Sequence, residues 1–159
     1  MRLHLSRIVS LISSGLIAGT FFYGTFSVLP AFYAVSPQIH LEFRTALMNG
    51  NRLMVMGLII FGILAMGWYT WEARYIRLTR TFCFCALALT LFSLIITRVG
   101  SVPINLQIKT WNSLAPPQAW LAILERWNFY NALRTTASFL SFACLLAADY
   151  GLKKFISKT

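Results

Sequence analysis

The stretch LMVMGLIIFGILAMGWYTW, residues 53–71, decides the fold of this chain. It carries no charge and lies between Arg52 and Glu72. A helix of roughly 20 apolar residues is long enough to cross the hydrocarbon core of a bilayer. The stretch therefore predicts a membrane-spanning helix.

Three further apolar runs flank this one, and Arg134 lies well inside the last of them. Because only helices and closed barrels satisfy their backbone groups in lipid, apolar runs of this length indicate helices. We predict an all-α integral membrane four-helix bundle that forms a single domain over residues 1–159. Its spans are expected at about 8–30, 53–71, 81–98 and 127–150.

The composition excludes a soluble enzyme. Of the 159 residues, 58% are hydrophobic and 11% are charged, whereas soluble domains carry roughly a quarter charged residues. The net charge of +10 would suggest nucleic acid in a soluble protein. Here the basic residues lie between the apolar runs, so we expect them to anchor the protein to lipid headgroups and not to bind nucleic acid.

The distribution of Lys and Arg gives the expected orientation. The termini and the short loop after residue 72 carry slightly more basic residues than the two longer loops. Cytoplasmic loops are enriched in Lys and Arg. We therefore expect both termini in the cytoplasm, in a plasma, inner or internal membrane, with loops 31–50 and 98–126 on the outer side.

Both outer loops are expected to form short interfacial helices. Ser36-Pro37 is typical of a helix start, which predicts a helix from Pro37 to Met48. Gly100 and Pro103 are expected to break the third span. Beyond them, Ile104, Ile108 and Trp111 recur at the spacing of an apolar helical stripe.

One face of the fourth span is polar. Its residues follow the spacing +4, +3, +4, +3, which places them on one side of a helix: Trp127, Asn131, Arg134, Ser138 and Ser141. Polar stripes on membrane helices face the bundle interior, and an intramembrane charge indicates a functional site. The alternative is that Arg134 snorkels to the interface or pairs with Glu42 or Glu125.

Two other polar residues expected at the outer end, Asn105 and His40, are candidates for ligand binding or catalysis. Asn105 follows Gly100 and Pro103 and would hydrogen-bond a buried ligand. His40 lies one turn before Arg44 and is the histidine expected on the outer side, as a neutral base or as the axial ligand of a haem or single metal ion. His4 is expected one bilayer thickness away, so we predict no site with two histidines. The cysteines are expected to be free thiols.

Glycines on the first span predict close packing. Gly15 and Gly19 form a Gly-x-x-x-Gly motif, which lets helices approach closely inside a bundle or between subunits. The expected partners are therefore membrane lipid, a hydrophobic small molecule, and a membrane protein or second copy at this face.

A series of short motifs lies between residues 98 and 135: Val-Pro-Ile-Asn105, Trp111, Pro116-Pro117, Arg126-Trp127 and Arg134-Thr135. With the Gly-rich first span, they resemble the anthrone oxygenase-like family of small four-helix membrane proteins. Most members have no assigned function, and named members oxidise anthrones to anthraquinones with molecular oxygen. The resemblance implies a similar activity here.

The resemblance carries over residue by residue. Asn105, Trp111, Trp127 and Arg134 match the family motif. Members often have His in the stretch Arg-Trp-x-x-x-His-x-x-Arg, where this chain has Asn131. An anthrone has an acidic C–H, so its oxidation needs a base, donors for the developing oxyanion and an aromatic-lined pocket.

These requirements assign roles to the candidate residues. His40 would be the base, and Arg134, Asn131 and Asn105 would hold the oxyanion. The residues expected to bind the flat substrate are Trp111, Trp127, Arg98, Asn49 and Arg52. The sequence thus predicts a membrane oxygenase or oxidoreductase acting on an anthrone- or quinol-like substrate. The alternatives are a non-catalytic subunit that binds pigment, lipid or another membrane protein, and, more weakly supported, a small transporter.

Overall fold

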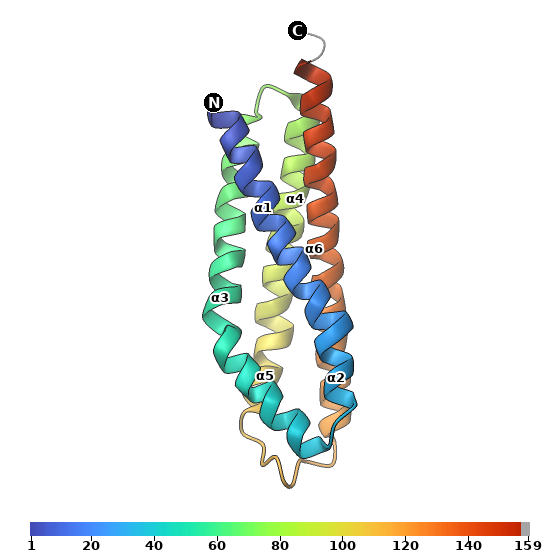
Figure 1. The fold of residues 1–159 in the computed structure, drawn as a ribbon. Helices are drawn as coiled ribbons and strands as arrows, with labels where there is room; N and C mark the ends of the chain where they lie inside the picture. Colours follow the sequence, from blue (N-terminus) through green and yellow to red (C-terminus); the bar gives the residue numbers. More distant parts are fainter. Residues whose placement is uncertain (157–159) are drawn as a thin grey trace.

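The computed structural model describes residues 1–156, with side chains as far as Lys154. In this part of the chain all regular structure is helical, and four long helices run alternately up and down (Figure 1). Each is long and apolar enough to cross a membrane. The predicted all-α, membrane-spanning four-helix bundle is therefore confirmed.

The four long helices are built from eight segments. They are α1 (Arg2–Tyr23), the π-helical segment η1 (Gly24–Val28) and α2 (Leu29–Tyr33); α3 (Pro37–Glu72); α4 (Arg77–Ile96), the π-helical segment η2 (Thr97–Ser101) and α5 (Val102–Ile108); and α6 (Trp120–Ile156). Helices α1 and α4 each pack against both α3 and α6. Both termini lie at one end of the bundle, which we call the termini end, and the opposite end is the loop end (Figure 1).

The helix predicted over residues 37–48 is the beginning of a much longer element. Ser36 has an extended backbone with ψ of 152°, and Pro37 is the first helical residue. From there α3 continues through Gly50 to Glu72 without a break, so no separate interfacial helix forms. One glycine weakens a helix by about 1 kcal/mol but keeps its backbone hydrogen bonds, and the apolar run that follows favours continuation.

The predicted break at Gly100 and Pro103 is wrong, because the third helix continues to Ile108. Segment η2 widens the helix just before the proline, and the Val102 amide donates to the Thr97 carbonyl. Segment η1 does the same before Pro30. Proline lacks an N–H, and the shifted hydrogen-bond pattern of a π-turn accommodates this without ending the helix.

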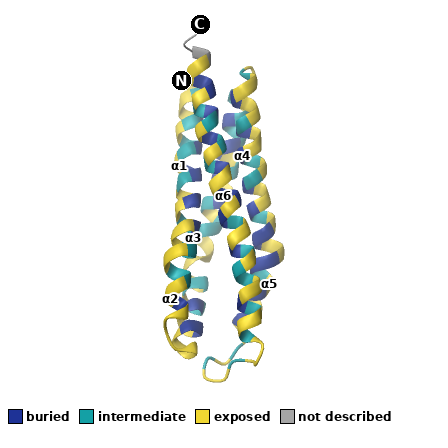
Figure 2. Cartoon of the chain, turned by 90° about the vertical axis from the view of Figure 1, so that its right-hand side faces the viewer, coloured by how far each residue is buried: buried dark blue, intermediate teal, exposed yellow. Residues whose placement is uncertain are grey.

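Small hydroxyl residues line much of the bundle interior. Buried residues follow the inward faces of the helices (Figure 2). Between α4 and α6, the hydroxyls of Thr90 and Ser141 lie 2.9 Å apart, and Ser141 also donates to the Ala86 carbonyl at 2.9 Å. Small residues let membrane helices approach closely, and their hydroxyls bond across the interface.

The two glycines predicted to form a packing face, Gly15 and Gly19, lie in different environments. A Cβ added at Gly15 would contact the ring of Phe142 on α6 at 3.5 Å, so Gly15 packs inside the bundle. Gly19 is exposed, with open space around its Cβ position. A partner at this face stays a prediction.

Candidate functional site

The loop end gathers aromatic and cationic side chains from three of the long helices. The helix start at Pro37 sets the rotation of α3, so His40 and Arg44, one turn apart, both face inward. Their exposed fractions are 1% and 2%. Charged side chains are costly at this depth unless they are paired or face a protein interior, so the position of Arg44 needs explanation.

His40 lies in an aromatic box. Its ring stacks on Phe32 with centroids 5.0 Å apart and an angle of 7° between the planes. Tyr33 and Trp120 present their rings at steep angles, with centroids at 5.2 and 5.8 Å. Nη1 of Arg44 lies 3.2 Å from Nε2 of His40. A guanidinium can only donate, so Nε2 accepts and the imidazole is neutral, with its proton on Nδ1.

Trp127 on α6 is at the centre of the site. Its indole Nε1 donates to Oδ1 of Asn105 at 2.7 Å. Two guanidiniums lie over its ring, with the Cζ of Arg44 at 4.2 Å from the centroid and that of Arg134 at 5.3 Å. Cation–π attraction of this kind is strongest for tryptophan. One ring therefore holds both cations and joins α3, α5 and α6.

Arg134 is oriented by Asn131 and the first helix. Its Nε and Nη2 donate to Oδ1 of Asn131 at 3.1 and 2.8 Å, and its Cζ lies 4.7 Å from the centroid of Phe21. Nδ2 of Asn131 donates to the hydroxyl of Thr25 at 2.8 Å. Thr25 belongs to η1, so the π-helical turn before Pro30 supplies the acceptor that fixes the amide.

The site has an excess of positive charge. Neither Arg44 nor Arg134 forms an ion pair with a carboxylate in the described part of the chain. Glu42 is exposed and accepts from Gln38 and Ser113 instead. Nη2 of Arg44 is buried without a hydrogen-bond partner. Two mostly buried guanidiniums without a counterion give this region a strong attraction for an anion.

The predicted site residues divide into two groups. His40, Asn105, Asn131, Arg134 and Trp127 are linked by the contacts above. Trp111 packs against the neighbouring apolar cluster of Leu41, Ile104, Ile108 and Leu124. Arg98, Asn49 and Arg52 are exposed, and Asn49 accepts from Lys109 at 2.6 Å. Their roles as substrate contacts remain predictions.

Sequence reasoning missed several members of the cluster. Arg44 was recognisable from its one-turn spacing to His40 after a helix start, but was assigned no role. The others, Phe21, Phe32, Thr25 and Trp120, come from segments distant in sequence. No local pattern distinguishes them from ordinary lipid-facing or core residues.

His40 and Arg44 are closed off from solvent in this structure, with exposed fractions of 1% and 2%. Two apolar grooves lie elsewhere on the bundle surface, and neither is lined by a cluster residue. One of them, of about 240 Å³, lies between α4 and α6 and is lined by Phe92, Phe129 and Leu133 among others. The space around His40 is occupied by its aromatic neighbours.

His40 is the group on which a haem or metal ion was predicted to depend. Its Nε2 is engaged by a cation, which competes with a metal for the same lone pair. Among the described residues, no three His, Cys, Asp or Glu side chains gather in a group that could hold a metal ion. His4 is exposed near the N-terminus.

Fold and site together define a class: small helical membrane proteins with a buried, cation-rich aromatic site at one end. The chain belongs to the anthrone oxygenase family, whose family pattern matches residues 43–144. The matched region contains Arg44, Asn105, Trp127 and Arg134, whereas His40 lies just before it. No curated protein and no solved structure matches the chain.

Proposed function

We propose that this protein is a membrane oxygenase that acts at the loop end on a flat apolar molecule, either an anthrone-like compound with an acidic C–H or a quinol-like compound; the steps below are those for an anthrone. The observation that carries the proposal is the pair of guanidiniums over Trp127 with no acid to balance them. A substrate that becomes an anion during reaction would supply the missing charge. The family match supports the reaction class.

Removal of the substrate proton is the first chemical step. Once the Arg44 guanidinium turns from Nε2 of His40 to the substrate oxygen, Nε2 takes the proton from the carbon between the aryl rings. The remaining electron pair spreads over the rings and the carbonyl oxygen. The donors that stabilise this oxyanion are Nη2 of Arg44 and the guanidinium of Arg134. Preorganised donors aimed at developing charge are commonly the largest contribution to catalysis.

Reaction with oxygen follows from the delocalised anion. It transfers one electron to O₂, and recombination forms a C–O bond and a peroxide anion, which takes the proton back from His40. Loss of water from the hydroperoxide leaves the new carbonyl, so one oxygen atom enters the product and the other leaves as water. Asn105 and Asn131 position Trp127 and Arg134 through the hydrogen bonds described above.

The closed cluster must open to admit a substrate. The groove between α4 and α6 is the proposed entrance, because its lining is apolar and includes Leu133, next to Arg134. A hydrophobic substrate dissolved in the bilayer reaches this groove without crossing water. Movement of α6 relative to α4 would then expose the guanidinium of Arg134.

Orientation is a further part of the proposal. The Lys and Arg distribution favours an orientation with the termini end in the cytoplasm and the loop end on the outer side. Labelling a cysteine introduced at Ala115, in the 109–119 loop, with a membrane-impermeant thiol reagent in intact cells tests this. Reaction in intact cells is expected, whereas reaction only after lysis would reverse the orientation.

Turnover by the purified protein is the decisive test. An anthrone is supplied in mild detergent, and quinone formation and oxygen consumption are measured together. Arg134→Gln is expected to lower the rate by about 10²–10³-fold, as the loss of an oxyanion donor does. Arg126→Gln is the matched control, since Arg126 is exposed on the same helix, and should retain the wild-type rate.

A second candidate function is ligand binding without turnover. The side-chain packing around His40 favours it, because a closed site is also what a structural or carrier subunit would have. Saturable binding of the anthrone with no quinone produced would support this candidate over the oxygenase. An absorption spectrum of the same sample shows whether a haem or other pigment is retained.

A further inference from the structure

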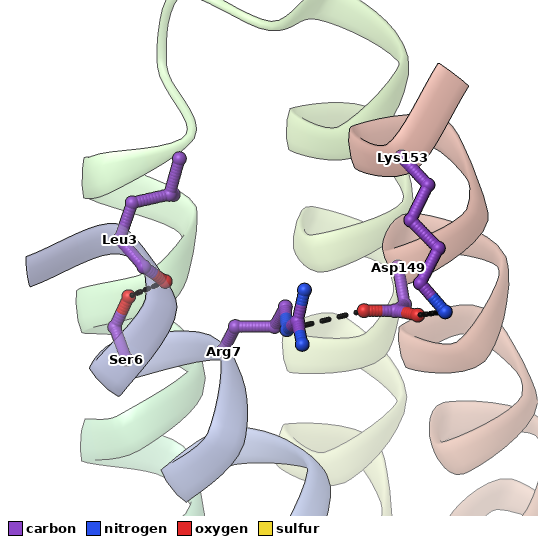
Figure 3. A network of polar contacts seen from close by, with 5 residues as sticks. All are labelled: Leu3, Ser6, Arg7, Asp149 and Lys153. Carbon is purple, nitrogen blue, oxygen red and sulfur yellow. Dashed lines mark hydrogen bonds and ion pairs between the residues drawn. The ribbon is translucent and has the colours of Figure 1, made fainter. Parts of the chain in front are cut away.

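A second polar cluster lies at the termini end, far from the site described above. Arg7 on α1 reaches across to Asp149 on α6, and Nε lies 3.2 Å from Oδ1 (Figure 3). Nζ of Lys153 lies 3.0 Å from the other oxygen, Oδ2. The side chains of Arg7 and Asp149 are about four-fifths buried, with exposed fractions of 23% and 17%. One carboxylate and two cationic side chains thus meet near the ends of α1 and α6.

Several polar atoms around this ion pair have no hydrogen-bond partner. They are the hydroxyls of Ser10, Tyr69 and Thr79, together with Nε of Arg7 and Oδ1 of Asp149, whose contact lacks hydrogen-bond geometry. Ser10, Tyr69 and Thr79 are completely buried. All four long helices contribute: α1, α3, α4 and α6.

The unpartnered atoms belong to one region. Ser10 follows Arg7 by one helical turn. Tyr69 belongs to the same buried cluster as Ala148, the residue before Asp149. The hydroxyl of Thr79 lies 3.3 Å from the Cβ position of Gly151, which is close to Asp149 along α6. The orphaned groups therefore lie at the same end of the bundle as the ion pair, on the helices next to it.

We propose that this cluster is a binding site for ordered water. Buried polar groups almost always have partners, and buried waters typically make about three hydrogen bonds to groups that the protein leaves unsatisfied. The set contains donors and acceptors: three hydroxyls, a guanidinium N–H and a carboxylate oxygen. A pure donor set would select an anion and a pure acceptor set a cation, whereas this mixture suits water.

The proposed water has a definite role. It hydrates the ion pair between Arg7 and Asp149, so that both groups stay charged between the helices, and it ties their hydroxyl neighbours into one network. Towards the bundle centre the site is closed by apolar residues, among them Ala86, Leu145 and Met66. Water at the termini end is thereby kept out of the loop-end site, and the inference does not depend on the proposed function.

The sign of a stability change tests the proposal. Thr79→Val removes one orphaned hydroxyl at nearly constant volume. In a dry site this change relieves an unsatisfied group and raises Tm, whereas in a hydrated site it removes a hydrogen bond to water and lowers Tm. Thr81→Val is the matched control, because Thr81 is exposed on the same helix and its hydroxyl donates to the Arg77 carbonyl.

Hydroxyl-radical labelling of the unaltered protein gives a second test. Radiolysis in ¹⁸O-water modifies side chains that touch ordered water even when they are buried. Tyr69 is expected to incorporate ¹⁸O despite its complete burial, and Thr79→Val is expected to reduce that labelling at least twofold. An unlabelled Tyr69, or a Tm of Thr79→Val equal to or above wild type once the control shift is subtracted, overturns the proposal.

Discussion

The two ends of the bundle solve the same problem in opposite ways. Both bury charged groups among helices of a membrane protein. At the termini end Arg7 is balanced by Asp149, and small hydroxyls lie on the helices next to the pair. At the loop end Arg44 and Arg134 lie over an aromatic ring, and no carboxylate among the described residues forms an ion pair with them. A buried charge with a partner of opposite sign in the protein needs no ligand, whereas one without such a partner indicates a ligand that brings the opposite charge.

Supplying the missing acid should remove the difference between the ends. Asn131→Asp places a carboxylate where Oδ1 already accepts two bonds from Arg134. The ion pair would satisfy that guanidinium, and the substrate oxyanion would meet a neutralised site. We expect the oxidation rate to fall by about 10²-fold or more with no loss of Tm.

Asn131→His is the paired variant. An imidazole can accept from Arg134 and donate to Thr25 as the amide does, and it is the residue that many family members are expected to carry. The rate should stay within a few-fold of wild type. An Asn131→Asp protein with full activity would show that the excess charge has no part in catalysis.

Removing the acid from the termini end should harm stability and not chemistry. Asp149→Asn leaves Arg7 and Lys153 with no counter-charge. Breaking a fully buried pair costs about 3–5 kcal/mol, and the partial exposure of this one reduces the expected loss to about 1–3 kcal/mol. Denaturant or thermal unfolding in detergent measures it.

Turnover of the remaining folded Asp149→Asn protein is the accompanying measurement. Because apolar residues separate the two ends, the rate per folded molecule should match wild type. A lower rate per folded Asp149→Asn molecule would mean that the termini end and the loop end are coupled, and that they cannot be treated as independent sites.

Segment η2 approaches α6 more closely than an ordinary helix contact allows. A Cβ at Gly100 would overlap the ring of Tyr130, whereas a Cβ at Gly57 meets open space. Gly100→Ala should destabilise the protein by about 1–3 kcal/mol through overpacking. It should also lower activity, because the strain moves Asn105 away from Trp127.

Gly57→Ala is the control for Gly100→Ala. With no clash, replacing a helical glycine should stabilise the protein by up to about 1 kcal/mol. Unfolding of both variants under the same conditions gives the contrast. If Gly100→Ala does not lower the free energy of unfolding, the helices separate freely at Gly100.

The sequence predicts the membrane-spanning bundle well because its signals are local. Apolar runs define the spans, and the +4, +3 spacing on α6 correctly places Asn131, Ser138 and Ser141 inside. The break predicted at Gly100 and Pro103 is wrong because the π-helical turn before the proline keeps the helix continuous, and the residue types alone do not distinguish such a turn from a break.

The rest of the site depends on rotation between helices, which spacing alone does not give. Arg52 lies eight residues after Arg44, about 80° further round α3, and this is enough to turn it outward. The box around His40 needs Phe32 and Trp120, which only the fold brings together. A neutral histidine among aromatics leaves no mark in the sequence beyond the histidine itself.

The smallest expected effect concerns the hydroxyls between α4 and α6 in the middle of the bundle. Thr90 and Ser141 bond to each other across α4 and α6 at 2.9 Å. A double-mutant cycle with Thr90→Val and Ser141→Ala should give a coupling energy of about 0.6 kcal/mol, the average for hydrogen bonds between membrane helices. Both hydroxyls have other acceptors, Met66 and the carbonyl of Ala86. When one hydroxyl is removed, the other keeps a hydrogen bond, so the coupling energy stays small. A coupling above about 2 kcal/mol would mean that these interior hydroxyls act as one cooperative network and not as separate links between helices.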